Sequence, residues 1–178
     1  TAALETTFAP PEWVSKCNMM KQIIVVSEHA KKNLKNTKDN NGTGISTPIT
    51  IIPFGYDDTI KPIDIYGDLD ITTSTLDFYG TKNRINAILN SVSKKRQCKV
   101  YFMHGSFTEQ EMLSLYNPKY IDCYVTATHG EGFGIPLFNA ACSGIPVVAT
   151  NWSGHLDFLR APSKSRTGKT KYKSHFLK

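Results

Sequence analysis

An acidic, glycine-rich segment between residues 128 and 150 holds the residues whose types and spacing could do chemistry. Glu131 opens this segment, and Pro136, which follows it closely, suits the first turn of a helix. Three glycines around Glu131 let the backbone approach a ligand closely: Gly130, Gly132 and Gly134. Free backbone N–H groups at a helix start would face an anion. The pattern predicts a phosphate-facing site where a loop meets a helix.

The elements that must position this loop are strands on either side of a helix. Residues 121–127 form an apolar run before the loop, which predicts a strand. A helix is expected over residues 136–143, and a buried strand over residues 146–149. This alternation of strands and helices is typical of α/β proteins with a parallel sheet.

The first 60 residues repeat that alternation. Apolar residues at helical spacing predict a helix within residues 10–20, and the run at 23–26 predicts a buried strand. Ser27 is expected to cap a helix beginning at Glu28. Another short strand is expected over residues 49–52. These pieces predict a strand-helix-strand unit and favour a parallel sheet.

The middle of the chain has less regular patterning. Residues 56–80 have sparse apolar positions, so no element is assigned there. Four residues at helical spacing then predict a helix: Ile85, Ile88, Leu89 and Val92. A strand is expected over residues 98–103. Thr108 and Glu111 form a capping-box pattern, which predicts the start of another helix.

Composition bounds the class of protein. The 178 residues, 40% of them hydrophobic, suffice for one ordinary globular domain and are marginal for two. No apolar run approaches the roughly 20 residues needed to span a bilayer. The first residues also lack the basic and apolar regions of a signal peptide. A soluble, cytoplasmic protein is therefore expected.

Cysteine and histidine spacing disfavours a metal centre. The four cysteines form no Cys-x-x-Cys pair and are expected to be reduced core thiols. His104, His129 and His155 are 25 and 26 residues apart, with no carboxylate at ligand spacing. No Gly-x-Ser-x-Gly nucleophile motif is present. We expect no metal and no cofactor.

Positive charge is concentrated at the end of the chain. The net charge is +6, yet seven basic residues and no acidic residue follow Asp157. The remainder of the chain is almost neutral, with 14 basic and 15 acidic residues. A basic tail can bind nucleic acid or make a peripheral contact with an anionic membrane. No nucleic-acid motif accompanies it, so a solvated connector or the cut end of a longer domain is the favoured interpretation, and nucleic-acid binding is disfavoured.

The Glu131 segment resembles the donor-site motif of the retaining "group 1" glycosyltransferases of the GT-B fold, the glycosyltransferase family 4-like enzymes. In that family a Glu opens a Gly-Phe-Gly-hydrophobic-Pro loop. Residues 13–30 and 51–57 resemble the end of the acceptor-side domain and the segment that crosses to the donor domain. The similarity covers most of residues 5–60 and nearly all of residues 97–160.

The resemblance implies an α/β fold with a Rossmann-like parallel sheet of the GT-B type and an incomplete two-domain architecture. It also implies a hexosyltransferase-like enzyme that moves a sugar from a nucleotide diphosphate to an unidentified acceptor, with retention and without a metal. Glu131 would be the catalytic residue and would contact sugar hydroxyls. The donor-binding residues would be His104, Gly105, Gly130, Phe133, Gly134, Ile135 and Asn139, with Asn139 facing the ribose.

Two departures from the family pattern accompany this resemblance. The family usually has a second Glu eight positions after the first, where this chain has Asn139, and an amide loses a charge-assisted bond worth on the order of 1 kcal/mol. No Arg- and Lys-containing loop for the diphosphate follows the crossing segment, and the sequence alone does not assign that role to Lys82 or Arg84 further along the chain. The sequence therefore looks like a shortened or fragmentary member of the family.

Three segments and two alternative functions follow from this reading. Residues 1–57 would be a remnant of the acceptor-side domain with the crossing segment, residues 58–160 a shortened donor domain, and residues 161–178 a basic tail. One alternative is a catalytically silent protein that binds a nucleotide or sugar. The other is a basic-tail adaptor that binds nucleic acid.

Overall fold

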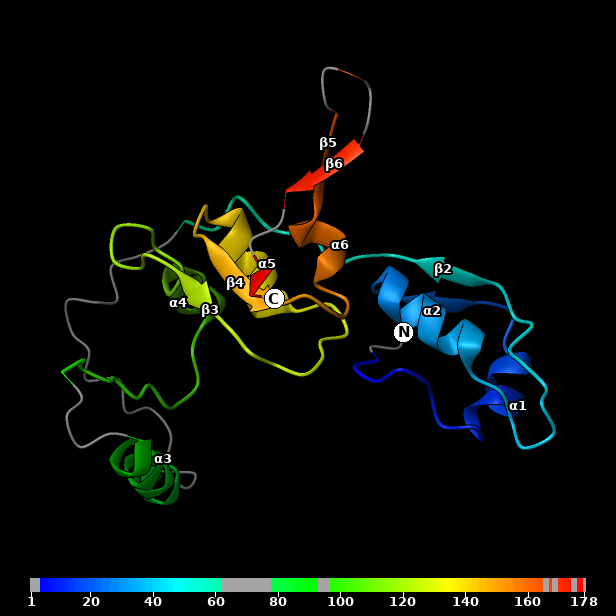
Figure 1. The fold of residues 1–178 in the computed structure, drawn as a ribbon, viewed down its shortest axis with the longest axis horizontal. Coiled ribbons are helices and arrows are strands. Elements are labelled where there is room, and N and C mark those ends of the chain that lie inside the picture. Colours follow the sequence, from blue (N-terminus) through cyan, green and yellow to red (C-terminus); the bar gives the residue numbers. More distant parts are fainter. Residues whose placement is uncertain are drawn as a thin grey trace. The chain divides into compact units, whose positions relative to one another are not determined.

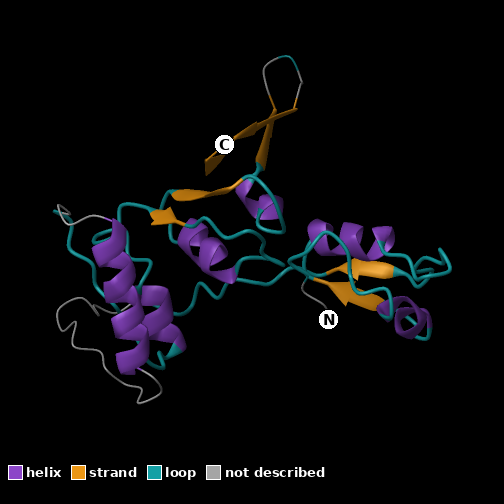
Figure 2. Ribbon diagram, turned by 60° about the horizontal axis from the view of Figure 1, so that its bottom comes forward, coloured by secondary structure: helices purple, strands orange, loops and turns teal. Residues whose placement is uncertain are grey.

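The computed structural model describes residues 4–61, 78–92, 97–164, 167, 170–173 and 176–177 (Figure 1). The chain divides into two compact units. The first unit combines residues 1–59 with residues 116–178, and the second contains residues 60–115. Helices and short strands alternate in the first unit, whereas helices and loops make up the described part of the second (Figure 2).

A strand-helix-strand motif begins the first unit. Strands β1 (Ile23–Val25) and β2 (Ile49–Ile51) pair in parallel, with Ile23 opposite Ile49. Helix α2 (Glu28–Asn36) connects them, and its Ala30 and Leu34 are buried against Val25. The parallel pairing confirms the predicted strand-helix-strand unit. The apolar residues of the strands and one face of α2 share a core.

Two local contacts fix the ends of this motif. Ser27 is the N-cap of α2, as predicted, and its hydroxyl accepts a hydrogen bond from Ala30 N. The predicted N-terminal helix is α1 (Trp13–Asn18), in which Val14 is buried. The Thr47 hydroxyl, which lies just before β2, donates to the Cys17 carbonyl at 2.7 Å. This bond holds α1 against the start of β2.

A second small parallel sheet carries the glycine-rich segment. Its strand order is β3 (Tyr124–Val125), β4 (Val147–Thr150) and β7 (Phe176–Leu177). Helix α5 (Ile135–Cys142) connects β3 to β4, and the short helix α6 (Leu156–Leu159) follows β4. The expected helix and following strand are confirmed. Strand β3 is shorter than predicted, since only two of its residues pair with β4.

The described residues at the end of the chain form strands. β5 (Ala161–Lys164) and β6 (Thr170–Lys173) form an antiparallel pair. β7 extends the sheet by pairing in parallel with β4, with Ala149 opposite Phe176. The basic tail therefore contains paired strands, which its composition had not indicated.

The second unit contains two helices among its described residues. The predicted helix near Ile85 is α3 (Phe78–Val92), and Thr108 caps α4 (Glu109–Ser114) in a complete capping box with Glu111. The expected strand over residues 98–103 was wrong: these residues have no strand pairing, and Tyr101 is 66% exposed. Much of the unassigned stretch, residues 62–77, lies outside the described residues.

The cysteines are free, but they are not core residues as expected. Cys17 is half-buried, and Cys98, Cys123 and Cys142 are exposed. In the part of the chain that the structure describes, no helix combines the length and apolar character needed to cross a membrane. The structure is an α/β arrangement with small parallel sheets. This arrangement is consistent with the predicted Rossmann-like fold class.

Candidate functional site

The backbone of Glu131 is held by the segment that follows β4. The Ser153 hydroxyl accepts a hydrogen bond from Glu131 N at 2.8 Å and lies 2.6 Å from the Glu131 carbonyl, to which it donates. Gly154 N donates to the same carbonyl at 2.9 Å. Three hydrogen bonds therefore fix the backbone N–H and carbonyl groups of Glu131, just before the start of α5.

This contact imposes an unusual backbone on the residues that make it. Ser153 has a φ of 99°, a conformation that non-glycine residues rarely adopt and that costs on the order of 1–3 kcal/mol. At Gly154 a Cβ would fall 2.1 Å from the Gly132 carbonyl oxygen. Only glycine fits at position 154, because the two segments pack backbone against backbone.

The opposite side of the loop is tied to α2. The Ser27 hydroxyl donates to the Gly132 carbonyl at 2.6 Å, in addition to capping α2. One Asp157 oxygen accepts a hydrogen bond from Glu28 N at 2.7 Å. Burial raises the pKa of the Asp157 carboxyl, although this hydrogen bond acts in the opposite direction. The first turn of α2 is therefore bonded both to the loop and to α6.

The start of α5 lies open next to this fixed loop. Its N-cap, Gly134, is left-handed, with a φ of 90°, and no side chain caps the helix. Ile135, in the first turn, is 46% exposed. The backbone N–H groups of a first turn have no acceptor within the helix and point out of its N-terminal end. The arrangement can hold an anion by amide hydrogen bonds and the helix dipole.

Aromatic side chains pack around Phe133, which lies within the loop. Phe133 is 5% exposed, and its ring centroid lies 5.0 to 5.3 Å from those of Phe54, Phe138 and Phe158. Close packing of the Phe133 ring therefore holds the middle of the loop against its aromatic neighbours.

Negative charge from Glu131 reaches a neighbouring phenol. Burial raises the pKa of the Tyr124 hydroxyl on β3, and the Glu131 carboxylate raises it further. Glu131 is itself half-buried. A carboxylate in this position can accept hydrogen bonds from ligand hydroxyl groups.

The structure places most of the predicted site residues together. Glu131, Phe133, Gly134 and Ile135 are consecutive around the start of α5. Asn139 is half-buried and lies one turn further along, on the same helix face as Ile135. Gly130 precedes them and lies against the Glu5 carbonyl and the Trp152 ring.

Two predicted residues, His104 and Gly105, belong to the second unit, whereas the loop belongs to the first. A strand was expected directly before them, but residues 98–103 do not form one. His104 lies among the Phe78 and Phe102 rings, with centroids 5.8 and 5.6 Å away. Its Nδ1 is buried and has no hydrogen-bond partner among the described residues.

The other histidines of interest differ in environment. His155 is fully buried, and its Nε2 lies 2.8 Å from the Thr150 carbonyl, which is a structural contact. His129 is exposed in the loop. Within the described ranges, no group of three His, Cys, Asp or Glu residues is arranged to hold a metal ion.

Sequence reasoning did not assign roles to the residues that hold the loop. Ser27 was expected only as a helix cap, and no role was expected for Ser153 or Gly154. A Ser-Gly pair directly after a buried strand, where the chain must turn sharply, was the feature that could have identified them.

The comparison with protein families identifies this segment. The model of the family described as "Glycosyl transferases group 1" matches residues 75–168, just over half of the chain. The match contains the Glu131 loop, α5, β4 and α6. No curated protein and no solved structure matches the chain. Together with the site built on the loop, the family match shows that the chain belongs to the group 1 glycosyl transferases.

Proposed function

We propose that the chain binds a nucleotide-diphosphate sugar at the Glu131 loop and transfers the sugar to an acceptor with retention and without a metal. Family membership supports a transferase role. The single observation that carries the proposal is the fixed Glu131 backbone beside the uncapped start of α5. This arrangement places a carboxylate that can accept hydrogen bonds from sugar hydroxyl groups beside a helix start that can bind an anion.

Each part of this site has a task in the proposed reaction. The α5 amides bind the diphosphate, and Glu131 binds hydroxyl groups of the donor sugar. The bond between the sugar C1 and the diphosphate breaks, and its electron pair leaves with the diphosphate. A bond forms between C1 and the acceptor oxygen on the same face, and the acceptor proton passes to the released phosphate. Amides aimed at the leaving group stabilise its developing charge.

Hydrogen exchange tests donor binding without requiring turnover. We expect a nucleoside diphosphate at saturation to protect the amides of residues 133–137, excluding Pro136, while α1 amides remain unchanged. The α1 amides serve as an internal control because they lie outside the loop. Unchanged exchange at residues 133–137 would contradict the proposed donor site.

Turnover is tested separately by following sugar release from nucleotide donors. Loss of product in Glu131→Gln, with nucleotide binding retained, is the result expected for a catalytic carboxylate. Binding without any product in the unmodified chain would instead favour the silent nucleotide-binding alternative, in agreement with Asn139 at the position of the second Glu.

A further inference from the structure

A pocket of about 490 Å³ lies in the first unit, between α2 and the residues that follow β4. Pockets that hold small molecules typically have volumes of roughly 300–1,000 Å³, so its size suits one or two sugar rings. None of the residues that form the proposed donor site lines it. The pocket therefore offers room for a second ligand.

Charge is distributed unevenly along this pocket. Lys31, Lys32 and Lys35 line it on the α2 side, whereas Glu28 and Asp157 line it near the start of that helix. A helix rises about 1.5 Å per residue, so positions 28 and 35 are separated by roughly 10 Å. A ligand of sugar size could place hydroxyl groups near the carboxylates and an anion near the lysines.

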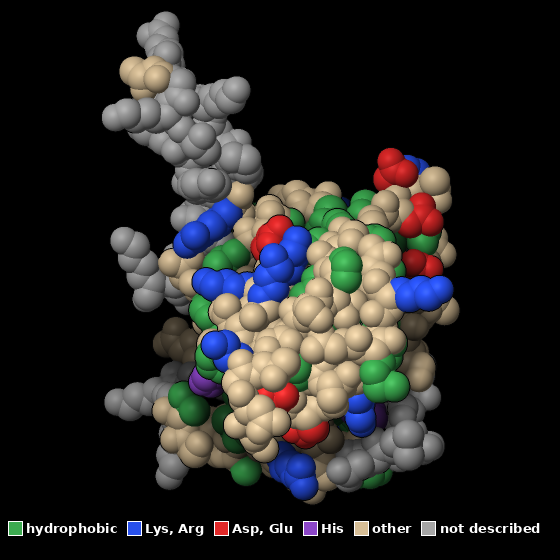
Figure 3. Space-filling view, turned by 90° about the vertical axis from the view of Figure 1, so that its right-hand side faces the viewer, with side chains coloured by type: hydrophobic (Ala, Val, Ile, Leu, Met, Phe, Trp, Pro, Cys, Tyr) green, Lys and Arg blue, Asp and Glu red, His purple; other side chains and the backbone are tan. Residues whose placement is uncertain are grey.

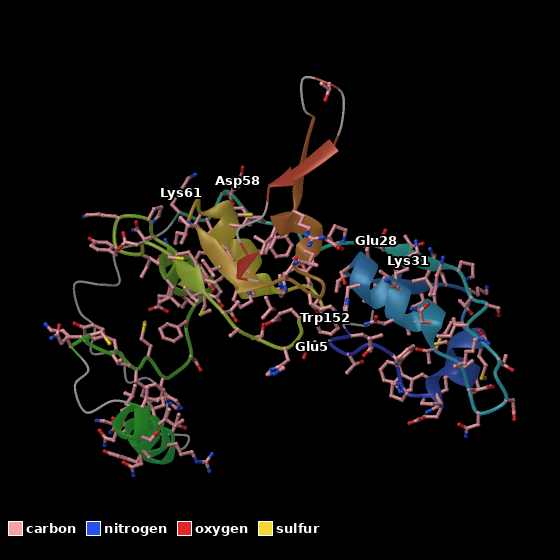
Figure 4. The ribbon with its side chains drawn as sticks, viewed as in Figure 1. Glu5, Glu28, Lys31, Asp58, Lys61 and Trp152 are labelled. Carbon is pink, nitrogen blue, oxygen red and sulfur yellow. The ribbon has the colours of Figure 1, made fainter. Side chains whose placement is uncertain are left out.

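On the face seen in Figure 3, Lys and Arg side chains gather in one area, with an acidic side chain beside them. Figure 4 shows the labelled Glu28 and Lys31 on α2, with Trp152 near the start of that helix. The polar residues of the pocket thus share their wall with an aromatic ring.

Trp152 supplies that aromatic surface. Its ring lies edge-on to His29, with centroids 4.8 Å apart, and the side chain remains 38% exposed. An aromatic ring offers a large apolar area with few rotatable bonds, against which the C–H face of a sugar ring can pack. A tryptophan in the same pocket as carboxylates and lysines is suited to a charged saccharide.

The neighbouring His29 forms part of the wall and is not a free base. Its Nε2 lies 3.0 Å from the Asn33 amide nitrogen, and Asn33 also donates to the Thr6 carbonyl. Burial lowers the pKa of His29. The hydrogen bond to Asn33 therefore holds the ring in place.

Ser153 connects the pocket to the proposed donor site. It lines the pocket, and its hydroxyl forms both hydrogen bonds to the Glu131 backbone. We propose that this pocket binds the acceptor, and that the acceptor is a saccharide carrying a phosphate or a carboxylate. The inference rests on the proposed function, because an acceptor site requires a donor site next to it.

Trp152 can report on binding directly. The chain has two tryptophans, so a Trp13→Phe background leaves Trp152 as the only one. Its fluorescence is titrated with glucose 6-phosphate, glucuronate, glucose and inorganic phosphate. We expect glucose 6-phosphate or glucuronate to bind at least about tenfold more tightly than glucose or inorganic phosphate, since a charged hydrogen bond contributes this much. Whichever of these two acidic sugars binds more tightly indicates whether the acceptor carries a phosphate or a carboxylate.

Matched charge variants localise the effect. Lys31→Gln with Lys35→Gln should weaken binding of the acidic sugar by roughly tenfold or more. Lys21→Gln with Lys38→Gln removes the same charge from exposed residues outside the pocket and should leave the affinity unchanged. Equal effects of the two pairs, or glucose binding as tightly as its acidic relatives, would overturn the proposal.

The hydrogen-exchange experiment separates this inference from the proposed function. Nucleotide protection of residues 133–137 without any response of Trp152 to the acidic sugars would overturn the acceptor site and leave the donor site standing. A response of Trp152 without nucleotide protection would overturn the acceptor role, because no donor would then be bound beside the pocket.

Discussion

Replacing Gly154 with alanine tests the packing that holds the Glu131 loop. A Cβ at this position would lie 2.1 Å from the Gly132 oxygen and 2.8 Å from the Glu131 oxygen, whereas ordinary contacts begin at 3.4 Å. The loop must therefore move by more than roughly 1 Å, since its backbone cannot rotate away as a side chain would. The hydrogen bond from Gly154 N to the Glu131 carbonyl would be strained by the same movement.

The expected cost follows from this displacement. Overpacking a close contact typically costs about 1–3 kcal/mol, and each kcal/mol lowers the melting temperature of a chain this size by about 2–4 °C. A displacement of about 1 Å at a catalytic group can also reduce the rate on the order of 100-fold. Gly154→Ala should therefore lower both the melting temperature and the affinity or turnover of the nucleotide donor.

Thermal unfolding and donor titration check this expectation together. Gly55→Ala is the matched control, because a Cβ there would meet no atom within 4 Å, and this variant should unfold near the temperature of the unmodified chain. An unchanged melting temperature and donor affinity in Gly154→Ala would refute the reasoning that the loop is fixed by backbone contact.

Three further predictions concern other parts of the molecule. Asn139→Glu should tighten nucleoside diphosphate binding by about tenfold for each 1.4 kcal/mol gained in titration calorimetry, with Asn90→Glu as the exposed control; equal or weaker binding would mean that position 139 does not face the ribose. Thr108→Ala should reduce the stability of the second unit by about 1 kcal/mol in denaturant unfolding, because it removes the capping box of α4, and an unchanged midpoint would contradict this role. Burial raises the pKa of Tyr116 to about 12, so its contribution to stability should be present below pH 10 and be lost as the pH rises towards 12; absorbance of the tyrosinate should show this late titration, and stability in Tyr116→Phe should lose that dependence.

The local patterns that could be predicted from the sequence share one property: they are complete within a few residues. Ser27 and Thr108 cap helices through bonds to residues three positions away, so their roles follow from spacing alone. The helix after Gly134 and the strand after Ile145 were likewise predictable from apolar periodicity.

The features that escaped prediction depend on contacts between distant segments. The run at residues 98–103 is apolar enough for a strand, but no partner strand pairs with it among the described residues. β7 comes from a polar, basic stretch, yet it pairs with β4. The bond from Ser27 to Gly132 joins residues 105 positions apart, which no local pattern encodes.

The hydroxyl of Ser27 performs its two tasks with different parts of the group. Its lone pair accepts the Ala30 amide and its proton is given to the Gly132 carbonyl, so the two bonds can break independently. Losing the bond to the Gly132 carbonyl would remove about 1 kcal/mol net, while the helix keeps its cap. The stability of α2 is therefore separate from its attachment to the glycine-rich loop, and a change that breaks this long-range bond need not unwind the helix.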